Sequence, residues 1–177
     1  LPRLDPEGTY TVVEDDVRVS GSRVGLLVGE QYTHDQLFTA LFLPSGNDAA
    51  GALARANGGM TPTLAQMNAE ARRLGALDTL AKNPSGLDAP DQRSSAYDLA
   101  LIAREGMKNQ AFARYASTKS AQFPGKAYSG GRRATFEIQT QNRLLRDQYP
   151  GALGIKTGFT TEAGRTFVGA AQRGGRT

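Results

Sequence analysis

The order of two hydrophobic periods along the chain most restricts what it can fold into. Between about residues 33 and 115, apolar side chains recur with helical spacing, as where Leu37 and Leu41 lie four positions apart. The flanking residues 9–30 and 117–177 instead contain stretches in which apolar and polar residues alternate as in strands. A helical middle between β-rich parts predicts an α+β fold, with a helical subdomain packed on an antiparallel sheet.

Helix starts can be placed from short capping signals. Thr33 and Gln36 have the spacing of a capping box, in which two side chains satisfy the free amides of a first turn. Ser95 begins a similar pattern, and Thr61 followed by Pro62 predicts another start. These signals predict helices that begin near residues 34, 62 and 96.

The strand predictions depend on alternation and on turn residues. Thr9–Val19 is predicted as a strand or hairpin, and Thr135–Gln139 as a strand. Leu153–Thr160 and Thr166–Gln172 are predicted as two strands joined by a turn. The polar, Gly- and Pro-rich stretch Lys119–Arg133 is predicted as a mobile surface loop.

Composition excludes some classes of function. The chain has no cysteine, which excludes disulfides, thiolate catalysis and cysteine-ligated zinc. The net charge of +4 would suit nucleic acid or an anionic envelope polymer, but no basic stripe with interleaved aromatics supports nucleic-acid binding. His34 is the only histidine, and we expect it on the surface of a helix rather than in a metal site. The longest apolar run, near Leu37–Leu43, is too short to span a membrane, so any membrane association would require other segments.

The stretch LFLPSGNDAA places polar groups at a corner between apolar residues. Ser45 and Asn47 are separated by Gly46, and all three residue types are common in plain turns. Asp48 could simply begin the next helix, because carboxylates suit a first turn. A chemical role for Ser45 and Asn47 requires partners elsewhere in the chain.

The stretch GIKTGFTTEAGR offers such partners. Lys156 can attract a carboxylate, Thr157 can donate a hydrogen bond, and Gly158 lets a ligand lie close to the backbone. The alternative is a lysine that keeps an edge strand soluble.

Taken together and in this order, Ser-x-Asn and Lys-Thr-Gly are the pattern of penicillin-binding proteins and serine β-lactamases. The resemblance is carried by three stretches, GSRVGLLVGEQYTHDQLFTALFLPSGNDAAGALA, NPSGLDAPDQRSSAYDLALIA and GIKTGFTTEAG. They resemble serine-type D-Ala-D-Ala carboxypeptidases of the low-molecular-mass penicillin-binding class. The resemblance implies a fold of the penicillin-binding-protein and serine β-lactamase type, with residues 1–177 as one truncated domain.

The resemblance also implies roles for the matching residues. Ser45 would relay a proton to the leaving group, and Asn47 would hold the acyl portion of the substrate and help order the catalytic lysine. Lys156 and Thr157 would bind the terminal carboxylate of a peptidoglycan stem peptide. The backbone N–H of Phe159 would form half of an oxyanion hole. The implied enzyme works outside the cytoplasm, binds β-lactams and needs neither a metal nor another cofactor.

The nucleophile motif of that family, Ser-x-x-Lys, does not occur in these 177 residues. Ser117 and Lys119 are only two positions apart, and Thr79 replaces serine in the spacing that ends at Lys82. We therefore expect the nucleophile upstream of this chain. The alternatives are a wall-peptide-binding domain without catalysis, and a β-lactamase or transpeptidase of the same superfamily.

Overall fold

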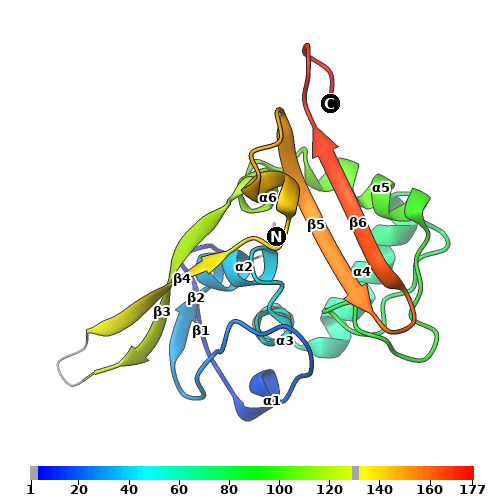
Figure 1. Ribbon diagram of the computed structural model, residues 1–177. Helices are drawn as coiled ribbons and strands as arrows, with labels where there is room; N and C mark the ends of the chain where they lie inside the picture. The colour runs from blue at the N-terminus through cyan, green and yellow to red at the C-terminus, as the bar shows by residue number, and fades with distance from the viewer. Residues whose placement is uncertain (1–3, 129–131) are drawn as a thin grey trace.

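A computed structural model describes residues 4–128 and 132–177 of the protein, and it combines helices with antiparallel strand pairs (Figure 1). The helices are α1 (Glu14–Val17), α2 (His34–Phe42), α3 (Asn47–Ala56), α4 (Met60–Arg73), α5 (Ala96–Gly106), α6 (Gln110–Ser117) and α7 (Arg143–Arg146). The strands are β1 (Thr9–Thr11), β2 (Gln31–Thr33), β3 (Ser120–Ala127), β4 (Arg133–Gln139), β5 (Ala152–Thr160) and β6 (Gly164–Ala171). The predicted α+β class is confirmed.

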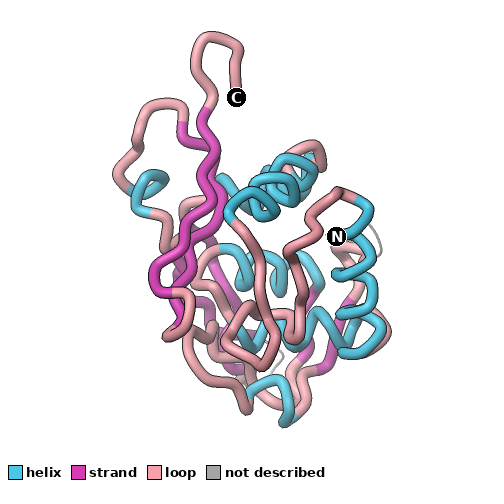
Figure 2. Tube along the Cα trace, turned by 90° about the vertical axis from the view of Figure 1, so that its right-hand side faces the viewer, coloured by secondary structure: helices cyan, strands magenta, loops and turns pink. Residues whose placement is uncertain are grey.

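The described strands form three separate two-stranded sheets, β1–β2, β3–β4 and β5–β6, rather than one continuous sheet. The β5–β6 hairpin lies along one side of the molecule, with most helices on the other side, whereas β3–β4 projects outward (Figures 1 and 2). In the β5–β6 ladder, Lys156 pairs with Val168 and Thr157 pairs with Phe167. This register fixes which face of the hairpin each side chain occupies.

The main core lies between β1–β2, the helices α2, α3 and α6, and the base of β3–β4. Leu37 and Leu43 are fully buried in it, and Tyr32 stacks on Phe123 with ring centroids 5.4 Å apart. A smaller cluster, around Ala116 and Ile155, joins α5 and α6 to β5. The helical subdomain therefore has its own core, and the β5–β6 hairpin packs against it through fewer apolar side chains.

Two of the predicted helix starts are confirmed. Thr33 is the N-cap of α2. Its side chain accepts a hydrogen bond from the backbone amide of Gln36, and Gln36 Oε1 accepts one from the backbone amide of Thr33. Ser95 is the N-cap of α5. The start at Thr61 was wrong, because α4 begins at Met60 after Gly59, and Pro62 occupies the third helical position. The backbone N–H groups of a first helical turn have no partner within the helix, so proline, which has no N–H, also fits at the third position.

The stretch Thr9–Val19 is not a hairpin. It contains the short strand β1 and then the helix α1, whose first turn carries three consecutive carboxylates. Asp16 is fully buried there, and it accepts hydrogen bonds from Val13 N and Tyr10 Oη and pairs with Arg55. Acidic side chains stabilise a helix N-terminus, which alternation alone does not reveal.

The predicted surface loop Lys119–Arg133 was also wrong for most of its length. Residues 120–127 form β3, which pairs with β4 and buries Phe123. Pro124 and Gly125 lie within the strand, next to an irregularity in the register, where both residue types are tolerated. Residues 129–131 of the predicted loop lie outside the described residues.

His34 is buried rather than on the surface. Its side chain is 9% exposed, and its Nδ1 lies 2.6 Å from the carbonyl oxygen of Asp5. Residues 5–8 cover the first turn of α2. A helical pattern read by itself does not reveal a contact with a segment so far away in the sequence.

Candidate functional site

The corner between α2 and α3 carries Ser45 in an unusual backbone conformation. Ser45 has φ +62°, which lies in the left-handed region of backbone conformation. This region is energetically unfavourable for a residue that has a Cβ atom. Gln141 contacts the corner through two hydrogen bonds. Its backbone N–H donates to Leu43 O, and its side-chain Nε2 donates to Pro44 O. A strained residue braced by a distant segment is typical of a functional site.

Asn47 is 8% exposed and begins α3. Its side-chain amide donates to the Ser20 carbonyl over 2.8 Å, and its backbone amide donates to Ser22 O. Gly21 makes this approach possible, since a Cβ on Gly21 would lie 2.9 Å from Asn47 Nδ2. The structure therefore directs the amide nitrogen of Asn47 to the 20–22 segment, and the roles expected of Asn47 stay predictions.

Asp48 does more than begin a helix. Its carboxylate is 1% exposed and accepts hydrogen bonds from the backbone amides of Val24, Gly25 and Leu26. It thereby fastens the glycine-rich segment to the corner that carries Ser45. The spacing of more than twenty residues left no local signal in the sequence for this contact.

Lys156 lies on β5 and points to the corner. Its Nζ donates to Ser45 Oγ over 2.9 Å and to its neighbour's carbonyl, Thr157 O, over 2.9 Å. Burial lowers the pKa of Lys156 to about 8, since desolvation penalises the charged ammonium. The two motifs found in the sequence thus meet through a direct hydrogen bond between residues 111 positions apart.

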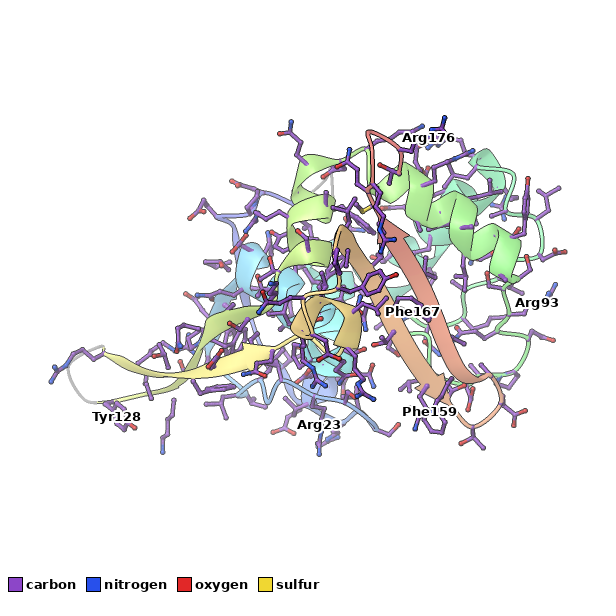
Figure 3. All side chains as sticks on the ribbon, turned by 45° about the horizontal axis from the view of Figure 1, so that its top comes forward. Arg23, Arg93, Tyr128, Phe159, Phe167 and Arg176 are labelled. Carbon is purple, nitrogen blue, oxygen red and sulfur yellow. The ribbon has the colours of Figure 1, made fainter. Side chains whose placement is uncertain are left out.

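The residues after Lys156 form an open surface on the hairpin. Thr157 is partly buried, while the side chain of Phe159 is 69% exposed near the turn end of β5 (Figure 3). Gly158 is required by packing, because a Cβ there would lie 2.4 Å from Thr166 Oγ1. Thr166 therefore occupies the space beside Gly158, and the role expected of Gly158 in substrate binding stays a prediction.

A cavity of about 420 Å³ adjoins this site. Asn47 lines it together with Ser20, Arg55 and most of the loop 82–88, including Leu87 and Asp88. A second cavity of about 480 Å³ has a mainly apolar lining from α2, α3 and α4, and none of the predicted site residues lines it. Of the predicted site residues, only Asn47 lines the 420 Å³ cavity, so Asn47 connects that cavity to the corner.

Ser117 takes no part in this arrangement. It is exposed at the end of α6, and its hydroxyl donates to the carbonyls of Ala113 and Arg114. Within the described residues, every helix falls short of the length and apolar content that a bilayer crossing requires.

The fold and the paired motifs define a class of protein, the penicillin-binding-protein-like DD-peptidases. The sequence matches the Peptidase S11 family, described as D-alanyl-D-alanine carboxypeptidase, over residues 2–177. The chain therefore belongs to this family, and the resemblance predicted from the motifs is confirmed.

One relative and two solved structures illustrate the similarity. The chain is 45% identical over 178 residues to the D-alanyl-D-alanine carboxypeptidase DacB2 of Mycobacterium tuberculosis, covering 99% of this chain and 59% of the relative. A crystal structure of a D-alanyl-D-alanine carboxypeptidase from that organism superposes with a TM-score of 0.90 at 45% identity, over 99% of this chain and 64% of the other. The Streptomyces K15 DD-transpeptidase superposes with a TM-score of 0.88 at 32% identity, over 99% and 71%. The chain thus spans about three fifths of the length of the DacB2 relative.

Proposed function

We propose that the whole protein is a serine-type D-alanyl-D-alanine carboxypeptidase that removes the terminal D-Ala of peptidoglycan stem peptides outside the cytoplasm. The observation that carries the proposal is the hydrogen bond from Lys156 Nζ to Ser45 Oγ. It brings the Ser-x-Asn and Lys-Thr-Gly motifs of the family to one place. Membership of the family supports the reaction, and the exposed backbone of β5 supports a peptide substrate.

In this proposal the nucleophilic serine comes from a Ser-x-x-Lys segment outside these 177 residues. The lysine of that segment takes the proton of the serine hydroxyl, and the serine oxygen attacks the carbonyl of the D-Ala-D-Ala bond. The Phe159 N–H stabilises the negative charge that develops on the carbonyl oxygen. Lys156 and Thr157 hold the terminal carboxylate. Ser45 passes a proton to the departing amine of D-Ala.

The acyl-enzyme ester is then hydrolysed by water, which regenerates the serine. The lowered pKa of Lys156 fits a lysine that shares a proton with Ser45 near neutral pH, because the charged and neutral forms then differ little in free energy. Asn47 holds the acyl portion of the substrate. No metal or other cofactor is needed for these steps.

The proposal is tested by the mass of the protein after incubation with penicillin. The chain of 177 residues is expected to form no covalent adduct, because none of its serines is followed three residues later by lysine. The whole protein with a Ser-x-x-Lys segment is expected to gain one penicillin and to release D-Ala from a peptide that ends in D-Ala-D-Ala. An adduct on Ser117 of the present chain would overturn the assignment, and transfer to an added amine in place of water would make the enzyme a transpeptidase.

A further inference from the structure

A loop far from the two motifs in sequence contacts the turn of the hairpin that carries Lys156. This is the loop 82–94, shown in green beside the β5–β6 turn at the lower right of Figure 1. Asp88 Oδ2 accepts hydrogen bonds from the backbone amides of Thr161, over 3.0 Å, and Glu162, over 3.3 Å. Both amides belong to the turn between β5 and β6.

The loop is internally braced, so it can hold Asp88 in place. Gln92 Oε1 accepts from the amides of Lys82 and Asn83, and its Nε2 donates to Leu87 O over 2.5 Å. The Asn83 side chain donates to Leu87 O over 2.7 Å and accepts from Gly86 N. The carbonyl next to Asp88 is therefore held by two side chains.

The root of the loop is fixed to the helical subdomain. Asn68 on α4 exchanges two hydrogen bonds with the backbone of Ala81. Two residues before Ala81, Thr79 donates to Asp98 at the first turn of α5, over 2.7 Å, and Leu80 pairs with Arg93 at the other end of the loop. Asp88 thus connects the hairpin turn to helices rather than to a free loop.

The hairpin is held at its other end by close packing. A Cβ on Gly154 would lie 2.5 Å from Ala116 O, so the backbones of β5 and α6 are in contact there. Toward the turn, Gly158 and Phe159 are exposed, and so are residues 161–163. Lys156 therefore lies between two differently held ends of the hairpin. The end near Gly154 is packed against α6, and the turn end is contacted from outside the hairpin by Asp88.

We propose that Asp88 is a positioning residue that sets the distance between the β5–β6 hairpin and the Ser45–Asn47 corner, and thereby the width of the substrate cleft. The proposal rests on the proposed function, since it assumes that a substrate lies between Lys156 and Asn47. The same loop also lies near the corner. Leu87 Cδ2 would lie 3.7 Å from a Cβ on Gly21, and Leu87, Asp88 and Asn47 line the same 420 Å³ cavity. Asp88 itself touches no reacting atom.

The test compares Asp88→Ala, Asp88→Asn and the control Asp78→Ala in the whole protein. Asp78 is exposed on the surface, so its replacement removes the same charge elsewhere. We expect Asp88→Ala to speed amide hydrogen exchange at Thr161 and Glu162 about tenfold, equivalent to about 1.4 kcal/mol. Asp88→Asn retains an oxygen acceptor and should stay within about threefold of the unmodified protein.

The kinetic readout is the release of D-Ala from a peptide ending in D-Ala-D-Ala. Asp88→Ala is expected to lower kcat/KM about tenfold, mainly through KM, with substantial rescue in Asp88→Asn and no change in Asp78→Ala. Unchanged exchange in Asp88→Ala would overturn the contact, and faster exchange with unchanged KM would overturn the positioning role. If the unmodified protein releases no D-Ala, the proposed function fails, whereas the exchange result still reports on the contact.

Discussion

At the scale of single residues, the site depends on backbone conformations that most side chains avoid. Ser45, two residues before Asn47, adopts φ +62°, and Gly21, close to the Asn47 side-chain amide, adopts φ +74°. The hydrogen bond from Lys156 to Ser45 then joins this strained corner to the hairpin. The site therefore consists of the Ser45 corner and strand β5, and their relative position determines which side chains can contact a substrate.

Replacing Lys156 by alanine tests its expected role as carboxylate anchor. In the whole protein, Lys156→Ala should raise KM and lower kcat/KM for peptides with a free terminal carboxylate by about 10- to 100-fold. A charge-assisted hydrogen bond contributes about 1.5–3 kcal/mol. Lys156→Arg should rescue only part of the loss, because a planar guanidinium places its charge differently from an ammonium.

The control for Lys156→Ala is a substrate whose terminal carboxylate is amidated. The loss should shrink for that substrate, because the lysine then has no anion to pair with. Equal losses for both substrates would mean that Lys156 supports the fold or the proton transfer through Ser45 instead.

Gly21→Ala tests whether the 20–22 segment shapes the site. A Cβ at φ +74° costs about 1–2 kcal/mol, and here it would also press on Asn47 Nδ2. Gly29→Ala is the matched control, since Gly29 has φ +82° and no atom within 4 Å of its added Cβ. We expect Gly21→Ala to lower the free energy of unfolding about 1 kcal/mol more than Gly29→Ala does, measured by urea denaturation. Equal losses in the two variants would show that Asn47 adjusts without cost.

At the scale of elements, α3 is the link between the glycine-rich segment and the site. The Asp48 carboxylate accepts hydrogen bonds from the backbone amides of residues 24–26, and its Oδ1 also accepts one from Ala49 N. Val24 and Leu26 are buried, so their amides would otherwise lie in the core without a hydrogen-bond partner. Asp48 thus replaces the ladder of hydrogen bonds that a paired strand would provide.

Asp48→Ala is expected to lower the free energy of unfolding by about 3 kcal/mol, because it leaves several buried amides unsatisfied. Asp48→Asn keeps one oxygen acceptor and should lose roughly half as much. Asp78→Ala, on the exposed surface, should change stability by less than about 0.5 kcal/mol. Thermal or urea unfolding measures all three, and a loss below about 1 kcal/mol for Asp48→Ala would contradict the role.

At the scale of the whole molecule, the site lies where two cores meet. The larger core holds the helical subdomain and the β1–β2 pair, and the smaller one joins β5 to α5 and α6. Lys156 bridges them, which places a partly buried ammonium at the boundary. The stability of the whole protein should therefore depend on the protonation of this one lysine.

The sign of that dependence follows from the lowered pKa of Lys156, about 8 against 10.5. Between these values the unfolded chain binds more protons than the folded one, so stability contributed by this group rises with pH. Lys156→Met should stabilise the protein at pH 7, by at most about 3 kcal/mol, and the gain should shrink as the pH rises from about 8 toward 10.5. The exposed Lys126→Met is the control. Urea unfolding at pH 7, 9 and 10 checks this, and a gain independent of pH would contradict it.

Much of the fold could be predicted from local patterns. The capping signals at Thr33 and Ser95 and the alternation in β5 and β6 act over a few residues, so they are visible in the sequence. The sequence did not predict β3, because Pro124 and Gly125 are typical of loops and the strand depends on pairing with β4. The burial of His34 was missed because the covering segment is distant in sequence.

The α+β class, the family and the residue types of the two motifs could be inferred from the sequence, because each of these is encoded in short spacings. The folded structure was needed to show that Lys156 donates to Ser45, that Asn47 donates to Ser20, and that Asp88 accepts from the hairpin turn. These contacts join residues 27 to 111 positions apart. Such contacts depend on how separate elements pack, and packing is set by the shapes of many side chains at once rather than by any local pattern.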